Sequence, residues 1–216
     1  YDVIVVSDEI HCDLTKPGTE YIPFASVDDT CRDISVTCIA PTKTFNLAGL
    51  QTAAVYAENS ILHHRMWRQL NTDEVAEPNA FAIQATIAAF QYGEEWLDEL
   101  REYVEKNKQY VTEFLQEKIP LIHPVAGDAT YLMWLDCRKI TESGRQFVKF
   151  IRKTSGLYVS GGNQYGRGGE GFLRVNVATS KLVVEDGMQR LYESVDAWLK
   201  AVSYTHLRAH ETGRNL

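Results

Sequence analysis

The chain has 216 residues, of which 44% are hydrophobic and 24% are charged, a balance typical of one globular domain or of two small ones. Its formal net charge of −7 argues against nucleic acid as the main partner, and no basic stripe interleaved with aromatic residues appears. No apolar stretch approaches the roughly 18 residues of a membrane-spanning helix and no signal peptide opens the chain, so we expect a cytoplasmic protein without a membrane partner.

The first half of the chain predicts buried strands followed by helices. The run from Val3 to Ser7 is short, apolar and bounded by charge, as in a strand covered on both faces of a parallel sheet. Ser35 to Ala40 predicts a second such strand, and Gln51 to Ala57 a third that leads away from the other two. Helical spacing favours helices from Ser60 to Leu70 and from Asn79 to Tyr92, the latter ended by Gly93.

The second half predicts a long amphipathic helix and a smaller mixture of strands and helices. Glu94 to Lys118 has apolar residues at helical spacing, acids in its first turn and Pro120 beyond its end. Alternation indicates strands from Thr130 to Asp136 and from Phe172 to Val177. Two further helices are expected, Gln146 to Thr154 and a final one that Ser180 caps and that continues to Val202.

The four cysteines support neither a metal site nor a disulfide framework. They show no C-x-x-C spacing and no nearby paired histidines: Cys12, Cys31, Cys38 and Cys137. Reduced thiols, as in the cytosol, are the expected state, and no metal is expected.

A carboxylate and a lysine 35 residues apart, Asp8 and Lys43, each follow an apolar run. Ligands of open α/β sheets gather beyond the carboxyl ends of the strands, which is where both residues would fall. The pairing suits pyridoxal phosphate, because an aldehyde cofactor with a pyridine ring needs a lysine to hold it as an imine and an anion to keep its ring nitrogen protonated. The alternatives are a surface lysine in a turn and an aspartate that caps a helix or a turn at a strand end.

Four blocks in order resemble the fold-type I pyridoxal-phosphate enzymes of the aminotransferase class I/II superfamily, and most closely their cystathionine β-lyase (MalY/PatB-type) branch. The blocks are Ser7 to Leu14, Ala40 to Gln51, Asn79 to Leu100 and Gly161 to Ala178. The resemblance implies an α/β fold: the C-terminal part of a large cofactor domain with a mostly parallel sheet, and a small α/β C-terminal domain.

The resemblance also implies roles for six residues. Lys43, in Pro-Thr-Lys-Thr-Phe-Asn, would hold the cofactor and then remove the substrate Cα proton; Asp8 would pair with the pyridinium nitrogen; and Thr42 would give its hydroxyl to the phosphate. Arg174 would grip the substrate α-carboxylate, or else be a salt-bridged surface arginine, and Tyr165 is a candidate on the substrate side. His11 stands where many aminotransferases carry a tyrosine that bonds the cofactor's 3′ oxygen, and a packing histidine is the alternative.

Some positions depart from the family or fail a motif. Ala40 and Gln51 stand where other aminotransferases have a serine and an arginine that contact the phosphate, so those two phosphate contacts are not expected in this chain. Gly166 to Gly171 satisfies G-x-G-x-x-G but precedes a strand, so the dinucleotide interpretation fails. Glu9 and the remaining histidines of the body, His63, His64 and His123, are expected to be structural.

By the resemblance, residues 1–93 belong to the cofactor domain, and residues 94–202 form the connecting helix and the small domain. The chain reads as a fragment that begins in mid-strand and is inactive alone. Residues 203–216 look like translated adapter read-through that breaks the helical period, and we expect His206 and His210 in that tail to bind no metal.

The predicted function is a carbon–sulfur β-lyase that converts an amino-acid substrate into pyruvate, ammonia and a thiol, as a homodimer when full length. An aminotransferase would use the same Lys43, Asp8 and Arg174, so these residues leave that alternative open. A second alternative is an aminotransferase-like sensor domain of a transcription regulator.

Overall fold

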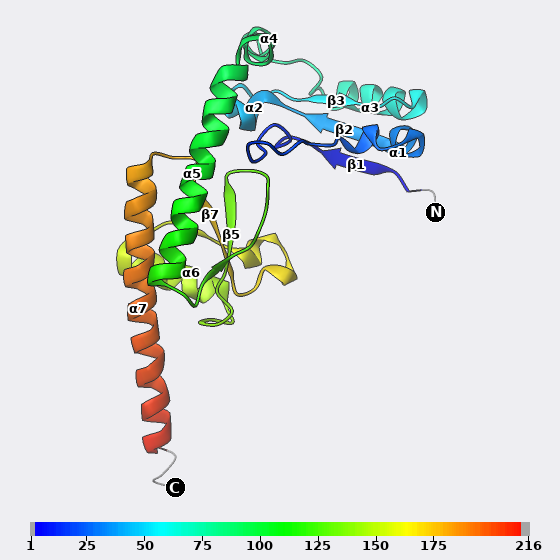
Figure 1. Ribbon diagram of the computed structural model, residues 1–216. Helices are drawn as coiled ribbons and strands as arrows, with labels where there is room; N and C mark the ends of the chain where they lie inside the picture. The colour runs from blue at the N-terminus through cyan, green and yellow to red at the C-terminus, as the bar shows by residue number, and fades with distance from the viewer. Residues whose placement is uncertain (1–2, 213–216) are drawn as a thin grey trace. The chain divides into compact units, whose positions relative to one another are not determined.

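The computed structural model describes residues 3–212, with side chains described for residues 3–202 (Figure 1). The chain forms two compact units. Unit 1 comprises Tyr1–Tyr103 and Asp128–Thr130, and unit 2 comprises Val104–Gly127 and Tyr131–Leu216. Helix α5 (Glu94–Lys118) contributes residues to both units, and its bounds are those predicted from the sequence.

The sheet of unit 1 has a parallel pair of strands and a third, antiparallel strand. β1 (Val5–Asp8) pairs with β2 (Ser35–Ile39) in parallel, with Asp8 opposite Cys38. β3 (Ala54–Tyr56) pairs antiparallel with β2 and therefore runs away from the edge at which β1 and β2 end. The three predicted strands are present, each shorter than predicted.

The apolar run of β1 predicted a strand covered on both faces, and the burial of β1 differs. Val6 is 67% exposed, and Val3 and Ile4 before it are more than half exposed. Among the described strands β1 pairs with β2 alone, so it lies at the edge of this sheet. The sequence pattern is that of a central strand, whereas the position in this chain is peripheral.

The helices of unit 1 include two short ones that the sequence analysis missed, α1 (Asp29–Ile34) and α2 (Pro41–Thr44). α3 (Ser60–Thr72) and α4 (Ala82–Tyr92) confirm predicted helices. α4 begins later than predicted because the Asn79 side chain accepts a hydrogen bond from the Phe81 N–H, 3.1 Å, and forms a turn there. Single-turn 3-10 helices complete the unit at η1 (Phe24–Ser26) and η2 (Ala48–Leu50).

Unit 2 contains an antiparallel sheet in the order β4-β5-β7-β6. Its strands are β4 (His123–Pro124), β5 (Leu132–Asp136), β6 (Ser160–Gly161) and β7 (Phe172–Asn176). Leu135 and Leu173 are fully buried on one face, whereas Trp134 and Arg174, which are register partners, belong to the other face. β4 and β6 are two-residue strands, too short for a periodic signal in the sequence.

Helices supply the rest of the core of unit 2. α6 (Gly144–Ser155) begins at the Ser143 cap and ends at Gly156, whose φ of 74° favours glycine. The indole of Trp198 in α7 (Lys181–Thr212) packs against Phe147 and Phe150, with ring centroids 5.3 and 5.0 Å away. The loop before β7 forms η3 (Gly162–Tyr165) and η4 (Arg167–Gly169).

α7 runs past the predicted end at Val202 and ends at Thr212. The side chains of His206 and His210 lie outside the described residues. The predicted division at residues 93 and 94, and the separate origin of residues 203–216, stay predictions. None of the helices within residues 3–212 is long and apolar enough to cross a membrane.

Candidate active site

Two of the predicted site residues lie at one edge of the unit 1 sheet. Asp8 is the last residue of β1, and Lys43 lies in α2, soon after the end of β2. Because β1 and β2 are parallel neighbours, their carboxyl ends meet at the same edge. The fold therefore brings this carboxylate and this ammonium group to the same edge of one sheet, where β1 and β2 end.

Lys43 is presented by a single helical turn. Pro41 occupies the first position of α2, where a missing N–H costs nothing, and the residue before it is extended. Pro41, Thr42 and Thr44 are buried, whereas the Lys43 side chain is exposed. Within residues 3–202 Lys43 makes no hydrogen bond and no ion pair, so its ammonium group is available to a ligand.

Asp8 is exposed and makes one weak local contact. Its Oδ1 accepts a hydrogen bond from the Ile10 N–H at 3.3 Å, as in a turn after a strand. Burial and then the charge of Asp8 raise the pKa of the Cys38 thiol. No arginine, lysine or histidine pairs with Asp8 in the part of the chain whose side chains are described.

His11 lies in the tight turn that follows β1. Its Nδ1 is 3.3 Å from the hydroxyl of Thr130, whose φ of 56° is unusual for a β-branched residue. The backbone of Thr130 also donates to the Leu14 carbonyl, 2.7 Å. Thr130 belongs to Asp128–Thr130, the segment before β5 that is part of unit 1, and its contact gives His11 a packing role. The predicted cofactor role of His11 stays a prediction.

Thr42 and Glu9 are both buried. Thr42 is 9% exposed and its carbonyl accepts from the Leu47 N–H at 3.0 Å. Glu9 accepts from the Ser7 hydroxyl at 2.9 Å and from the Phe24 N–H at 3.2 Å, contacts that suit the structural role predicted for it. The predicted contact of Thr42 with a phosphate stays a prediction.

An aromatic cluster fixes the residues that follow Lys43. The Phe45 ring meets Phe90 edge to face, with centroids 5.4 Å apart, and lies 5.9 Å from Trp96. A Cβ at Gly93 would come within 2.5 Å of the Phe45 ring, so this position requires glycine. α2 is therefore held against the start of α5 by packing that the sequence motif alone does not reveal.

The other two predicted site residues, Arg174 and Tyr165, contact each other in unit 2. The Arg174 guanidinium lies over the Tyr165 ring, 4.3 Å from its centroid, and Trp134 meets the same ring edge to face at 5.6 Å. No carboxylate pairs with Arg174 among the described side chains, so the salt-bridged alternative finds no partner there. Because the guanidinium is stacked and not ion-paired, its coplanar N–H donors stay available to a carboxylate.

Two aromatic neighbours of Arg174, its stacking partner Tyr165 and its register partner Trp134, also line a cavity. This cavity has a volume of about 300 Å³ and is lined by Val125, Trp134, Tyr165, Gly168, Gly169 and Phe172. Burial raises the pKa of the Tyr131 phenol, and the positive charge of Arg174 opposes that shift. Tyr131 is therefore a neutral hydroxyl at physiological pH.

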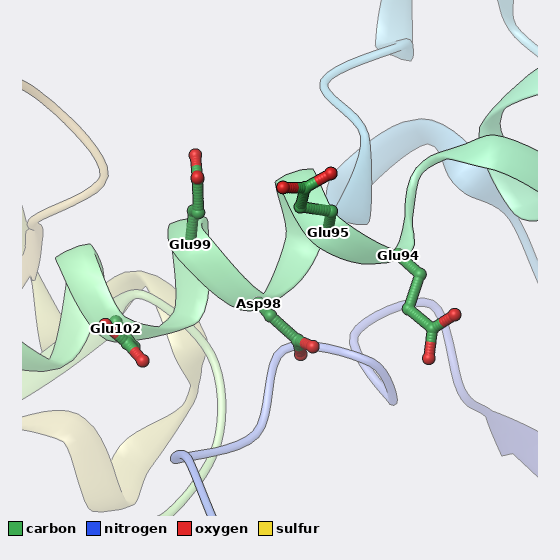
Figure 2. Close-up of a pocket in the computed structure, with 5 residues that line it drawn as sticks. All are labelled: Glu94, Glu95, Asp98, Glu99 and Glu102. Carbon is green, nitrogen blue, oxygen red and sulfur yellow. The ribbon is translucent and has the colours of Figure 1, made fainter.

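A strongly acidic stretch of α5 also borders a hollow, of about 380 Å³, lined by Glu94, Glu95, Asp98, Glu99 and Glu102. Figure 2 shows these carboxylates pointing in different directions from the helix, with Glu99 and Glu94 on opposite sides. Acids in the first turn are favoured by the helix dipole, which accounts for Glu94 and Glu95. Within the described residues no three acidic, histidine or cysteine side chains are placed to hold a metal ion.

Sequence reasoning missed several polar residues that support the predicted ones. The Thr44 hydroxyl donates to Asp13 Oδ2 at 3.0 Å, and Arg101 donates to the Thr15 carbonyl at 2.9 Å and to the Thr15 hydroxyl at 2.8 Å. Thr130, whose hydroxyl lies 3.3 Å from His11 Nδ1, is a further supporting residue. Their partners are distant in sequence, and no local pattern signals such contacts.

Comparison with known proteins places these residues in a family. A sequence model described as aminotransferase class I and II matches residues 1–191. Cystathionine beta-lyase PatB of Bacillus subtilis is 40% identical over 191 residues, covering 88% of this chain and 49% of that protein. Protein MalY of Escherichia coli is 30% identical over 198 residues, covering 91% and 50%.

A solved structure supports the same family assignment. Cystalysin from Treponema denticola, which contains a pyridoxal 5′-phosphate cofactor, matches with a TM-score of 0.86 and 28% identity, covering 90% of this chain and 49% of that one. The chain spans about half the length of the curated relatives it matches. The predicted α/β fold and the predicted resemblance are confirmed, and the chain belongs to the aminotransferase class I and II family.

Proposed function

We propose that this chain is the C-terminal part of a pyridoxal-phosphate-dependent carbon–sulfur β-lyase. Such an enzyme converts an S-substituted cysteine and water into a thiol, pyruvate and ammonia. The observation that carries the proposal is that Asp8 ends β1 and Lys43 lies just after its parallel neighbour β2, at one sheet edge, with neither residue paired with an opposite charge among the described side chains. Similarity to cystathionine beta-lyase PatB supports the lyase over other reactions of the family.

The residues at this edge fit the chemical groups of the cofactor. An amine that makes no ion pair suits an aldehyde, and an exposed carboxylate suits a protonated ring nitrogen. When bound, pyridoxal phosphate supplies a cationic ring that accepts the electron pair left on the substrate Cα. Asp8 would hold the proton on the ring nitrogen, and the Thr42 hydroxyl would donate to the phosphate.

Lys43 has two tasks in this proposal. Its Nζ would hold the cofactor at rest and, once substrate has replaced it, accept the Cα proton and hold it at Nζ. Proton transfer by a positioned group contributes on the order of 10²–10⁴ in rate. The exposed position of Lys43 on a short, firmly packed turn suits a side chain that must be held and then released.

Arg174 would bind the substrate α-carboxylate through two parallel N–H···O bonds. The carboxylate then fixes the orientation of the Cα–H bond that breaks. Tyr165, stacked on the guanidinium at 4.3 Å, would hold those N–H donors in one orientation. His11 stays a candidate for tuning the cofactor through its 3′ oxygen.

The proposal includes a homodimer and a cytoplasmic location for the full-length enzyme. Large apolar side chains on β1 and at the start of α4 are exposed, among them Val6 at 67% and Phe81 at 77%. Such surfaces are typical of positions that further chain or a second subunit covers. The four cysteines are free thiols, which accords with a reducing compartment.

The alternative is an aminotransferase, which the name of the matching family favours. The deciding experiment supplies the full-length protein with L-cystathionine and measures pyruvate without any keto-acid acceptor. Pyruvate formation supports the lyase. Strict dependence on 2-oxoglutarate, with the substrate's amino group recovered on glutamate, would instead establish the aminotransferase.

A further inference from the structure

Lys43 lies in a helix of four residues, and a helix this short is not stable by itself. Contacts from elsewhere in unit 1 must therefore fix α2. Phe45 provides one such contact through its aromatic cluster. The residue between Lys43 and Phe45, Thr44, provides a second contact of a different kind.

Thr44 is fully buried and its hydroxyl donates to Asp13 Oδ2 at 3.0 Å. In unit 1 it is the only described side chain larger than serine with less than 2% exposure. A hydroxyl so deeply buried needs a partner, because leaving it unpaired is costly. The side chain next to the reactive lysine is thus tied to one particular carboxylate.

Asp13 is itself held in place by the turn that follows Asp8. The Cys12 N–H donates to the Glu9 carbonyl at 3.0 Å, and the Glu9 N–H donates to the Cys38 carbonyl of β2 at 2.9 Å. Just beyond Asp13, Arg101 binds the backbone and side chain of Thr15. The acceptor of the Thr44 hydroxyl is therefore fixed relative to the strand that carries Asp8.

We propose that Asp13 and Thr44 are positioning residues that fix Lys43 relative to Asp8 by joining α2 to the turn after β1. This inference rests on the proposed function, since it concerns the placement of the lysine used there. In this proposal neither residue binds the cofactor or the substrate. They act through the backbone of α2, and their loss leaves both charged groups present but no longer held in one relative position.

Four variants of the full-length enzyme test the pair. Thr44→Val removes the hydroxyl and keeps the shape, whereas Thr44→Ser restores a hydroxyl. Asp13→Ala removes the acceptor, whereas Asp13→Asn keeps a carbonyl acceptor at that position. Thr86→Val is the matched control, because Thr86 also donates its hydroxyl, to the Ala82 carbonyl at 2.7 Å, but within α4.

The first readout is hydrogen exchange of residues 41–47 in the protein without cofactor, which does not depend on the proposed function. Thr44→Val and Asp13→Ala should each speed exchange of the Phe45 and Leu47 amides about tenfold, and the double variant no further. Thr44→Ser, Asp13→Asn and Thr86→Val should stay near wild type. Additive effects of the two substitutions, or unchanged exchange in both, would overturn the coupling.

The second readout separates positioning from folding. In the cofactor-loaded enzyme Thr44→Val should lower kcat about tenfold or more and leave KM nearly unchanged, with recovery in Thr44→Ser. A KM rise with constant kcat, or no rescue by serine, would refute a positioning role. If Thr44→Val does not fold, the Asp13→Asn and Asp13→Ala pair gives the same comparison. A wild type without lyase or aminotransferase activity would contradict the proposed function, while the exchange result still decides the coupling.

Discussion

Replacing Arg174 by alanine should separate substrate recognition from folding. In the proposal the guanidinium binds the substrate carboxylate, while within the described side chains it makes no ion pair and only stacks on Tyr165 at 4.3 Å. The substitution therefore removes a ligand-binding group whose contribution to folding is small. Arg174→Lys keeps the charge but loses the paired N–H donors of the guanidinium, so its kcat/KM should lie between those of wild type and Arg174→Ala.

The size of the effect follows from these contacts. A stack of this kind contributes about 0.5–1 kcal/mol at an exposed site, so the free energy of unfolding should fall by no more than about 1 kcal/mol. Two hydrogen bonds to a charged carboxylate contribute about 1.5–3 kcal/mol each, so losing both should lower kcat/KM by about 10² or more. Cofactor binding should change by less than about threefold, under 1 kcal/mol.

The assay measures kcat/KM for L-cystathionine, cofactor affinity and urea unfolding of the same variants of the full-length protein. Arg152→Ala is the matched control, because its guanidinium lies over the Tyr158 ring at 4.6 Å in the same unit. The control should reproduce the small change in stability and leave kcat/KM unchanged. Equal losses of cofactor affinity and kcat/KM in Arg174→Ala, or a kcat/KM equal to that of the control, would refute carboxylate recognition.

Three further predictions concern unit 2. Asn107→Ala should destabilise the protein by about 2 kcal/mol in urea unfolding, because the buried amide donates to the Val177 and Thr179 carbonyls at 2.8 and 3.0 Å; no change would contradict this account. The Arg138 guanidinium lowers the pKa of Asp136 from 3.8 to about 2, so this pair stabilises the fold above pH 3.8 and loses that effect as the pH falls toward 2. Because Arg138 is 64% exposed, solvent screens this pair and the gain is small. Asp136→Asn should flatten this part of the acid-unfolding curve, and an unchanged slope would rule the pair out. Burial raises the pKa of the Cys137 thiol to about 12, so iodoacetamide at pH 8 should leave Cys137 unmodified until the protein unfolds, and rapid native labelling would be inconsistent with its burial.

Long periodic elements could be predicted from the sequence, whereas short ones could not. α5 has the predicted bounds because 25 residues of helical spacing give a clear signal. α2 and β6 have four and two residues, so neither contains a full period of any pattern. β1 was predicted as a strand, but its exposure depends on what lies beside it and not on its own residues.

In the candidate site, too, some features could be predicted from the sequence and others only from the folded chain. The placement of Asp8 and Lys43 at one edge of the sheet could be predicted, because two apolar runs that pair in parallel end at the same edge, and the roles of both residues stay predictions. The contacts that hold these motifs could not, since Asp13 and Thr44 are 31 positions apart, and His11 and Thr130 are 119 apart. Only the folded chain brings such partners together.

The central claim is that Lys43 is the lysine that binds the cofactor. Borohydride reduction of the full-length protein with pyridoxal phosphate, followed by peptide mass spectrometry, tests it directly. The account predicts a reduced pyridoxyl adduct on Lys43 alone, and in Lys43→Ala loss of both the adduct and the visible absorption band, with Lys200→Ala as the unaffected control. An adduct on another lysine, or a visible band that survives in Lys43→Ala, would contradict it.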